Sequence, residues 1–167
     1  VKVWLINKEE DTGIGELVVE GPNVMEGYWG IRDEDSGVFE SDMENGKRRV
    51  YTGDLFRIDS EGFLYFCGRR NGIIKIRGYR VNGFWIEEMM RKISGVKEAA
   101  VTGLPDQVTG EHAAVFIYAD DAAVKSAVEE TIRQMPFYLQ NTEVFLLHTP
   151  FPRNRNGKTD IKKLCVM

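Results

Sequence analysis

The chain has 167 residues, of which 43% are hydrophobic and 29% are charged, and these proportions are ordinary for a globular protein. Its 26 acidic and 22 basic residues give a net charge of −4 without a long basic run, so we expect no nucleic-acid partner. Two cysteines and two histidines are too few for a disulfide framework or a zinc site, so we expect no bound metal and a cytoplasmic location.

The first part of the chain is predicted to consist of strands. Short apolar or alternating runs, separated by Gly, Asp, Asn and Pro, lie at Val3–Ile6, Gly15–Glu20, Arg49–Tyr51, Leu55–Ile58 and Phe63–Cys67. The first run is too short for a signal peptide or a membrane span, and the polar stretch from Gly30 to Lys47 is predicted to be a loop. This part offers too little apolar patterning to close a core, so we interpret residues 1–68 as the β-rich tail of a larger domain.

From residue 73 onward, strand and helix patterns alternate. Strands are expected at Ile73–Arg77, Val96–Thr102, Ala113–Tyr118 and Glu143–Leu147. Helical spacing of apolar residues predicts a helix over Phe84–Ile93 with Asn82 as its N-cap, a second from Asp120 or Asp121 to Pro136, and a short one from about Thr159. The predicted fold class is α+β. A small C-terminal domain over residues 73–167, with a mixed sheet of the three-stranded type and flanking helices, follows a junction at residues 69–72.

Three polar segments stand out in order along the chain. They are Tyr51-Thr52-Gly53-Asp54-Leu55, the stretch GRRNGIIKIRGYRV at 68–81, and PRNRNGKTD at 152–160. Each is a weak signal alone: Thr-Gly-Asp is usually a turn, and the Gly-Lys-Thr of the third segment lacks the earlier glycine of a P-loop, where Pro152 stands instead. As an ordered set, with GEL at 15–17 and GYW at 27–29 upstream, they resemble the late core motifs of the adenylate-forming superfamily. That superfamily includes acyl-CoA synthetases, adenylation domains of nonribosomal peptide synthetases, D-alanine–carrier-protein ligases and luciferases.

The residue types suit the chemistry that this resemblance implies. The Asp54 carboxylate can accept two hydrogen bonds from a ribose diol, and the Arg69 guanidinium can donate to ribose or phosphate oxygens. Lys158, in a polar loop, can bring a positive charge to a carboxylate and an α-phosphate at once. By resemblance, Asp54 and Arg69 bind the nucleotide and Lys158 is the catalytic lysine of adenylate formation. For each residue taken alone, a turn or a solvated surface position is the commoner explanation.

Two further pairs of residues take their expected roles from the same resemblance. Asn71 and Gly72 stand where the family has a hinge about which its small domain rotates between two half-reactions, although Asp is common at the first position. Both residue types tolerate unusual backbone angles. Gly78 and Arg80, on a predicted hairpin, are expected to lie beside the thiol-bearing pantetheine arm. The alternative interpretation is a surface hairpin that merely carries basic side chains. Glu87 is expected to be structural.

In the family, one loop binds the phosphates of ATP, another segment holds the adenine and the magnesium ion, and a pocket binds the carboxylic acid. None of these three has a counterpart in these residues. We therefore expect a fragment, inactive alone, of an AMP-forming acid–thiol ligase. The resemblance implies that the parent activates a carboxylic acid, amino acids included, with ATP and transfers the acyl group to CoA or a carrier-protein thiol. The implied cofactors are ATP, Mg²⁺ held by the absent part, and CoA or phosphopantetheine. The alternative is a non-catalytic interaction module that docks a carrier protein.

Overall fold

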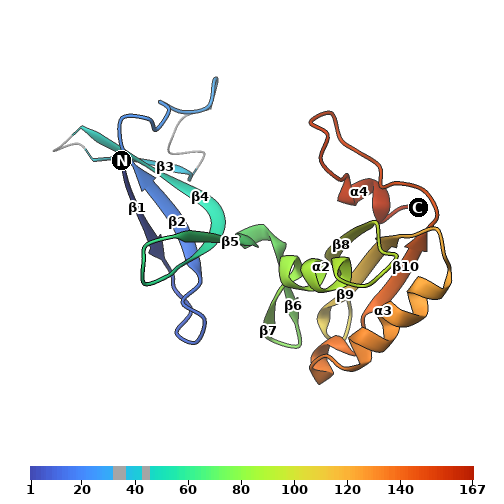
Figure 1. Ribbon diagram of the computed structural model, residues 1–167. Coiled ribbons are helices and arrows are strands. Elements are labelled where there is room, and N and C mark those ends of the chain that lie inside the picture. The colour runs from blue at the N-terminus through green and yellow to red at the C-terminus, as the bar shows by residue number, and fades with distance from the viewer. Residues whose placement is uncertain (32–36, 43–45) are drawn as a thin grey trace. The chain divides into compact units, whose positions relative to one another are not determined.

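The computed structural model describes residues 1–31, 37–42 and 46–167, and the chain divides into two compact units, Val1–Asn71 and Gly72–Met167 (Figure 1). Strands dominate the first unit, and the second combines strands with helices, so the fold class is α+β as predicted. The loop predicted over Gly30–Lys47 is wrong for Phe39–Asp42, which forms a strand because its backbone pairs with the following strand. Residues 32–36 and 43–45 of that predicted loop lie outside the described residues.

The described residues of the first unit form one antiparallel sheet. Its strands are β1 (Lys2–Ile6), β2 (Gly15–Glu20), β3 (Phe39–Asp42), β4 (Lys47–Ile58) and β5 (Leu64–Arg69). Their order is β1-β2-β4-β3, and β5 also pairs with β4. Two short strands were predicted where β4 forms one strand of 12 residues, because the Thr52-Gly53-Asp54 segment is an irregularity that shifts the register with β2 without ending the strand. The register shifts between Leu55 and Phe56, next to that segment.

The second unit contains a mixed sheet of five strands, more than the three-stranded type that we predicted. Its strands are β6 (Ile73–Ile76), β7 (Tyr79–Asn82), β8 (Glu98–Asp106), β9 (Gly110–Tyr118) and β10 (Glu143–Leu147), the last with the predicted bounds. The sheet is mixed because β9 pairs antiparallel with β8 and parallel with β10. It is larger than predicted because the β6–β7 hairpin joins it through the pairing of Ile76 with Gly110.

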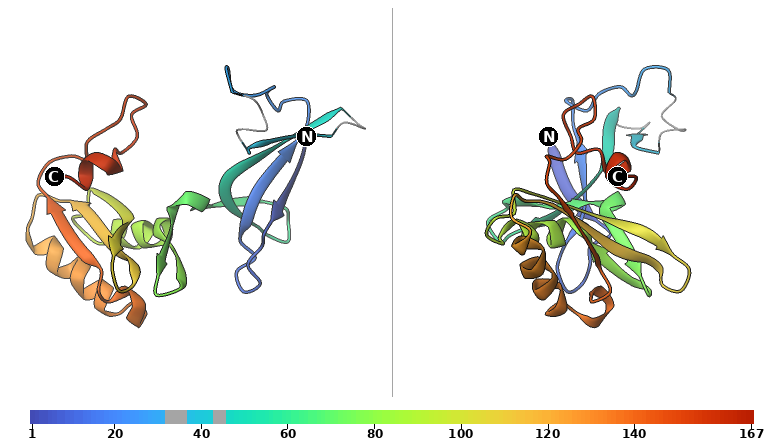
Figure 2. Two further views of the ribbon diagram at one scale, coloured as in Figure 1. Left: turned by 180° about the vertical axis from the view of Figure 1, so that it is seen from behind. Right: turned by 90° about the vertical axis from the view of Figure 1, so that its right-hand side faces the viewer.

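The helices of the second unit cover both faces of its sheet. They are α2 (Gly83–Arg91), α3 (Ala123–Arg133) and the short α4 (Ile161–Leu164), with 3₁₀ turns η1 (Arg70–Gly72) and η2 (Phe137–Leu139) beside them. Successive residues of a strand point to opposite faces. Val115 and Ile117 of β9 therefore pack with α2 and α3, whereas Phe116 packs with Phe151 and Leu164 on the side of α4 (Figure 2).

Local capping explains where the two longer helices begin. The Asn82 side chain accepts a hydrogen bond from the backbone N–H of Phe84 at 3.1 Å, as predicted for an N-cap. Asp121 accepts one from Ala123 at 2.8 Å in the first turn of α3, although the residue at the N-cap position is Ala122. Helix α2 ends two residues earlier than predicted, at Arg91.

Candidate functional site

The sheet of the first unit brings the two predicted nucleotide residues together. Asp54 on β4 and Arg69 on β5 are direct partners in the antiparallel register. The Arg69 Nε donates a hydrogen bond to Asp54 Oδ1, and the two side chains are 54% and 29% exposed, respectively. The pair is therefore open to solvent and presents a carboxylate and a guanidinium to the same point of the surface.

A buried carboxylate shapes the backbone directly before Asp54. Glu16 on β2 is 2% exposed, accepts a hydrogen bond from the Gly53 N–H at 3.0 Å and forms an ion pair with Arg70 at 3.0 Å. Gly53 has φ of +68°, which side chains other than glycine rarely adopt. The Thr52 hydroxyl donates to the Leu17 carbonyl at 2.9 Å and accepts from the Asp54 N–H at 3.1 Å.

Sequence reasoning missed Glu16 as a site residue. Its only signal was an acid within the apolar run Gly15–Glu20, and nothing in the local pattern showed that this acid is buried. Its partner Arg70 directly precedes the two predicted hinge residues, Asn71 and Gly72, which lie in η1 on either side of the boundary between the compact units. The ion pair therefore ties the last residues before that boundary to the first unit.

The hairpin that carries Gly78 and Arg80 turns through two residues. Arg77 and Gly78 have φ of +50° and +84°, which is the geometry of a type I′ turn. Apart from Gly78 itself and its two chain neighbours, no atom of the described residues lies within 4 Å of the place where a Cβ on Gly78 would stand, so its backbone is open to an approaching molecule. Arg80 on β7 lies directly opposite Lys75 on β6. Tyr79, between Gly78 and Arg80 in the sequence, stacks on Tyr138 with ring centroids 4.3 Å apart.

Lys158 lies in a structured hairpin-like loop and is exposed. The Asn154 N–H donates to the Lys158 carbonyl at 2.8 Å, and the Lys158 N–H donates back to the Asn154 side chain at 3.1 Å. The Lys158 ammonium forms no hydrogen bond or ion pair within residues 1–31, 37–42 and 46–167. The structure therefore fixes the backbone of this lysine and leaves its charge available.

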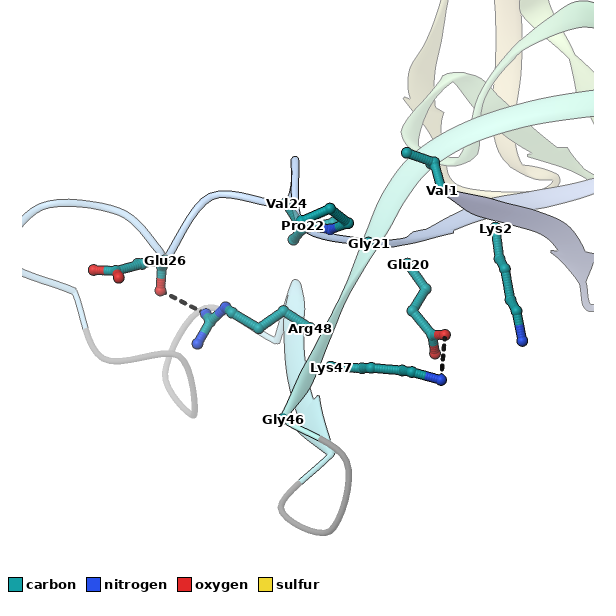
Figure 3. Close-up of a pocket in the computed structure, with 10 residues that line it drawn as sticks. All are labelled: Val1, Lys2, Glu20, Gly21, Pro22, Val24, Glu26, Gly46, Lys47 and Arg48. Carbon is teal, nitrogen blue, oxygen red and sulfur yellow. Dashed lines mark hydrogen bonds and ion pairs between the residues drawn. The ribbon is translucent and has the colours of Figure 1, made fainter.

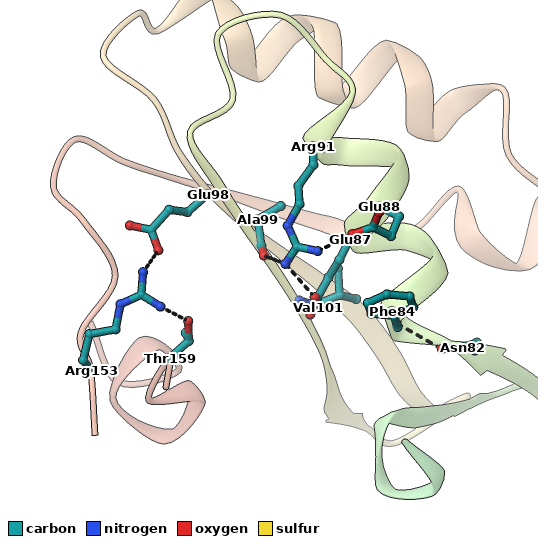
Figure 4. A network of polar contacts seen from close by, with 10 residues as sticks. All are labelled: Asn82, Phe84, Glu87, Glu88, Arg91, Glu98, Ala99, Val101, Arg153 and Thr159. Carbon is teal, nitrogen blue, oxygen red and sulfur yellow. Dashed lines mark hydrogen bonds and ion pairs between the residues drawn. The ribbon is translucent and has the colours of Figure 1, made fainter. Parts of the chain in front are cut away.

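Contacts to β8 hold the lysine loop and α2 against the sheet (Figure 4). Arg153 donates to the Glu98 carboxylate and, at 2.8 Å, to the Thr159 hydroxyl. On α2, the Glu87 carboxylate accepts hydrogen bonds from the Val101 N–H of β8 and from the Arg91 side chain, each at 3.0 Å. Burial raises the pKa of the Glu87 carboxyl above its ordinary value, and these two hydrogen bonds partly oppose the rise. The contacts agree with the structural role expected for Glu87.

Two cavities among the described residues are lined by none of the predicted site residues. One of about 510 Å³ opens in the first unit where Glu20 pairs with Arg49, at the opposite end of β2 from Glu16 (Figure 3). Its lining residues are Val1, Lys2, Glu20, Gly21, Pro22, Val24, Glu26, Gly46, Lys47 and Arg48. The hydrogen bond from Arg49 is the main reason why the pKa of Glu20 is lowered. A second cavity of about 690 Å³ lies between β10 and the C-terminal segment of the second unit.

No metal site is formed by the part of the chain that the structure describes. In residues 1–31, 37–42 and 46–167, no three His, Cys, Asp or Glu side chains gather closely enough to hold an ion. None of the helices described there is long and apolar enough to cross a membrane.

Comparisons with known proteins place this arrangement in one class. Residues 85–158 match the family described as AMP-binding enzyme C-terminal domain. A long-chain-fatty-acid–CoA ligase of Bacillus subtilis is 34% identical over 70% of this chain and 20% of its own length. Bacitracin synthase 2 of Bacillus licheniformis is 32% identical over 90% of this chain and 6% of its own length. The crystal structure of ATP-bound MatB from Rhodopseudomonas palustris matches with a TM-score of 0.78 and 26% identity, over 98% of this chain and 33% of that one.

The predicted resemblance to the adenylate-forming superfamily is confirmed by the family match, by the similar ligase and by the similar fold. The matched residues 85–158 lie within the second unit, which is therefore similar to the AMP-binding enzyme C-terminal domain. The chain spans about a fifth of the length of the fatty-acid ligase and a third of the MatB chain.

Proposed function

We propose that this chain is part of an AMP-forming acid–thiol ligase. In the first half-reaction, a carboxylate oxygen attacks the α-phosphorus of ATP, and pyrophosphate leaves as the acyl-adenylate forms. In the second, a thiolate of CoA or of a carrier-protein phosphopantetheine attacks the acyl carbon, and AMP leaves. The observation that carries the proposal is the exposed ammonium of Lys158, which has no partner among the residues that the structure describes and stands on a structured loop.

Lys158 is proposed to act in the first half-reaction. The attacking carboxylate and the α-phosphate are both negative, so they repel each other until a cation lies between them. An ammonium contributes a compact positive charge on a long side chain. Because the loop backbone is already fixed, the charge can be placed without ordering the loop during the reaction.

Asp54 and Arg69 are proposed to hold the ribose of the nucleotide. An ionised carboxylate offers about four lone-pair positions, so the hydrogen bond from Arg69 to Oδ1 leaves acceptor capacity for both ribose hydroxyls. The guanidinium has five N–H donors, and those not used on Asp54 are available to ribose or phosphate oxygens. The pair can therefore bind nucleotide without first separating.

The second unit is proposed to rotate about Asn71 and Gly72 between the half-reactions. The loop with Lys158 and the hairpin with Gly78 and Arg80 project from opposite sides of this unit (Figure 1). Two groups on opposite sides of one rigid body cannot both face the same acyl-adenylate, so the unit must turn to present each in its step. The boundary between the compact units falls at these two residues, which supports this hinge.

The proposed acceptor side consists of the open backbone of Gly78 and the charge of Arg80. A glycine lets a thin pantetheine arm approach the main chain, and an arginine can pair with its phosphate. Mg²⁺ accompanies ATP in such reactions, and the described residues offer no site for it, so we assign it to another part of the parent protein. The use of ATP and a thiol acceptor, together with the sparse cysteines, favours a cytoplasmic location.

The test compares Lys158→Ala with Lys162→Ala in the whole protein that contains this chain. Lys162 is an exposed neighbour on α4, so its replacement removes the same charge from the same region. We expect acid-dependent pyrophosphate release to fall by about 10²–10³-fold in the first variant and to persist in the second. The measurement uses a panel of fatty, aryl and amino acids.

Two results would oppose this proposal. Release that is indifferent to Lys158 would remove its catalytic role. No release with any acid, combined with binding of a carrier protein, would favour the non-catalytic docking module.

A further inference from the structure

Glu98, at the start of β8, makes two polar contacts between the sheet and the lysine loop. One carboxylate oxygen accepts from the Arg153 guanidinium, and the other accepts from the Phe151 N–H at 3.4 Å. Phe151 itself is 3% exposed and packs with Phe116 in the core. Glu98 therefore holds the loop where it leaves the core.

Arg153 connects the two arms of the loop. Its guanidinium contacts Glu98 on the sheet and the Thr159 hydroxyl on the returning arm, and its backbone forms an isolated bridge with Thr159. Lys158 is the residue directly before Thr159. A guanidinium presents several donors in a rigid plane, so it can hold both partners in one geometry.

Asn154 shapes the tip of the same loop. Its side-chain oxygen accepts from the N–H groups of Asn156 at 2.9 Å and of Lys158 at 3.1 Å. The loop thus has an internal frame at Asn154 and an external attachment at Glu98. The internal frame fixes the conformation of the tip, whereas the attachment fixes the tip relative to the sheet.

We propose that Glu98 and Arg153 are positioning residues whose ion pair sets where the Lys158 ammonium lies. This inference rests on the proposed role of Lys158 in adenylate formation. The pair is partly exposed, with side chains 21% and 48% accessible, and exposed ion pairs contribute little to global stability. Its loss is therefore expected to misplace the loop without unfolding the second unit.

The first experiment separates the two half-reactions in the whole protein. Glu98→Gln, Arg153→Gln and the double variant are compared with Arg155→Gln, which removes a charge from the same loop at an exposed residue with no side-chain partner in the described part of the chain. We expect the kcat of acid-dependent pyrophosphate release to fall about 10- to 100-fold in the first three variants. Thioester formation from supplied acyl-adenylate, which does not use Lys158, is expected to stay within about twofold of the wild type.

The double variant tests whether the two side chains act together. If they work only as a pair, the double variant loses no more activity than either single variant, because the second replacement removes nothing further. Equal losses in both half-reactions would indicate general damage and overturn the inference. The inference would also be overturned if every variant released pyrophosphate as fast as the Arg155→Gln control. The proposed function would still stand in that case.

A second experiment does not depend on activity. Trypsin cleaves after exposed Arg and Lys, and Glu98→Gln leaves every such residue of the 167-residue chain in place. We expect several-fold faster cleavage after Arg155 and Lys158 in this variant, whereas Glu129→Gln on α3 is expected to match the wild type. Unchanged cleavage in Glu98→Gln would show that Glu98 does not hold the loop and would overturn the inference. Wild-type protein without acid-dependent release would instead overturn the proposed function, and with it the placement of Lys158.

Discussion

At the residue scale, the carboxylates of this chain differ in what surrounds them. Asp54 is partly exposed beside Arg69, whereas Glu16 is buried and uses both oxygens on the neighbouring main chain and Arg70. Glu87 is partly buried between α2 and β8, with its side chain 21% exposed. The same functional group supports the structure at Glu16 and Glu87, whereas the more open surroundings of Asp54 leave it available for the nucleotide-binding role that we propose.

Glu87 predicts a pH dependence of stability. Burial raises the pKa of its carboxyl in the folded state above the ordinary value of 4.5. Between the two values the folded state binds more protons than the unfolded state, so the free energy of unfolding falls as pH rises through this window. Glu87→Gln does not titrate and keeps an acceptor for the Val101 N–H.

We therefore expect the stability of Glu87→Gln relative to the wild type to improve from about pH 4 to about pH 7, measured by urea unfolding. Glu88→Gln is the matched control, because Glu88 also pairs with Arg91 but is 47% exposed. A relative stability that is constant over this range for Glu87→Gln would contradict the prediction.

At the element scale, the β6–β7 hairpin shows how local conformation places a proposed site. Both turn residues have positive φ, which suits glycine and is unfavourable for the arginine at position 77. The turn is held by the Arg77 N–H, which donates to the Thr109 carbonyl at 3.0 Å, and by the stacking of Tyr79 on Tyr138. Neighbouring elements thus hold the hairpin in place.

The turn predicts opposite effects for substitutions at its two residues. Gly78→Ala places a Cβ in the left-handed region and is expected to destabilise the second unit by about 1 kcal/mol. Arg77→Asn gives the Asn-Gly pair that this turn favours and is expected to stabilise it by about 0.5 kcal/mol. Both values are measured by urea unfolding of the 167-residue chain. Equal stability of the two variants would contradict the type I′ geometry.

At the scale of the whole molecule, the two compact units differ in their cores. The second unit has buried apolar clusters on both faces of its sheet. In the described part of the first unit, the buried apolar side chains are Leu5, Leu17, Val18 and Phe39, while Phe63, Leu64, Tyr65 and Phe66 are exposed. Because apolar burial is the main stabilising term in folding, the first unit is expected to be the weaker one.

This difference predicts unfolding in two steps. Amide hydrogen exchange of the 167-residue chain is expected to show the strongest protection in β8 and β9 and weak protection in β1 and β5. In urea, the first unit is expected to unfold at the lower concentration. A shortened chain of residues 72–167 serves as the control and is expected to keep the protection of β8 and β9. A single transition with uniform protection would contradict this expectation.

The sequence by itself determined the class of protein and the residue types of the candidate site. The bounds of β10 and the Asn82 cap depend on nearby residues, so local patterns were enough to predict them. Asp54 and Lys158 were singled out by the order of the motifs along the whole chain and by the resemblance that this order carries. The β3 strand was missed because its partner, not its own polar composition, makes it a strand.

Only the tertiary structure decided which distant groups meet. The partners Glu98 and Arg153 are 55 positions apart, and Glu16 and Arg70 are 54 apart. Their contacts depend on strand register and on the path of the chain after the last strand, and neither leaves a pattern in either segment alone. The sequence could therefore point to Lys158, whereas the side chains that hold its loop became visible only when the sheet brought β8 and the C-terminal segment together.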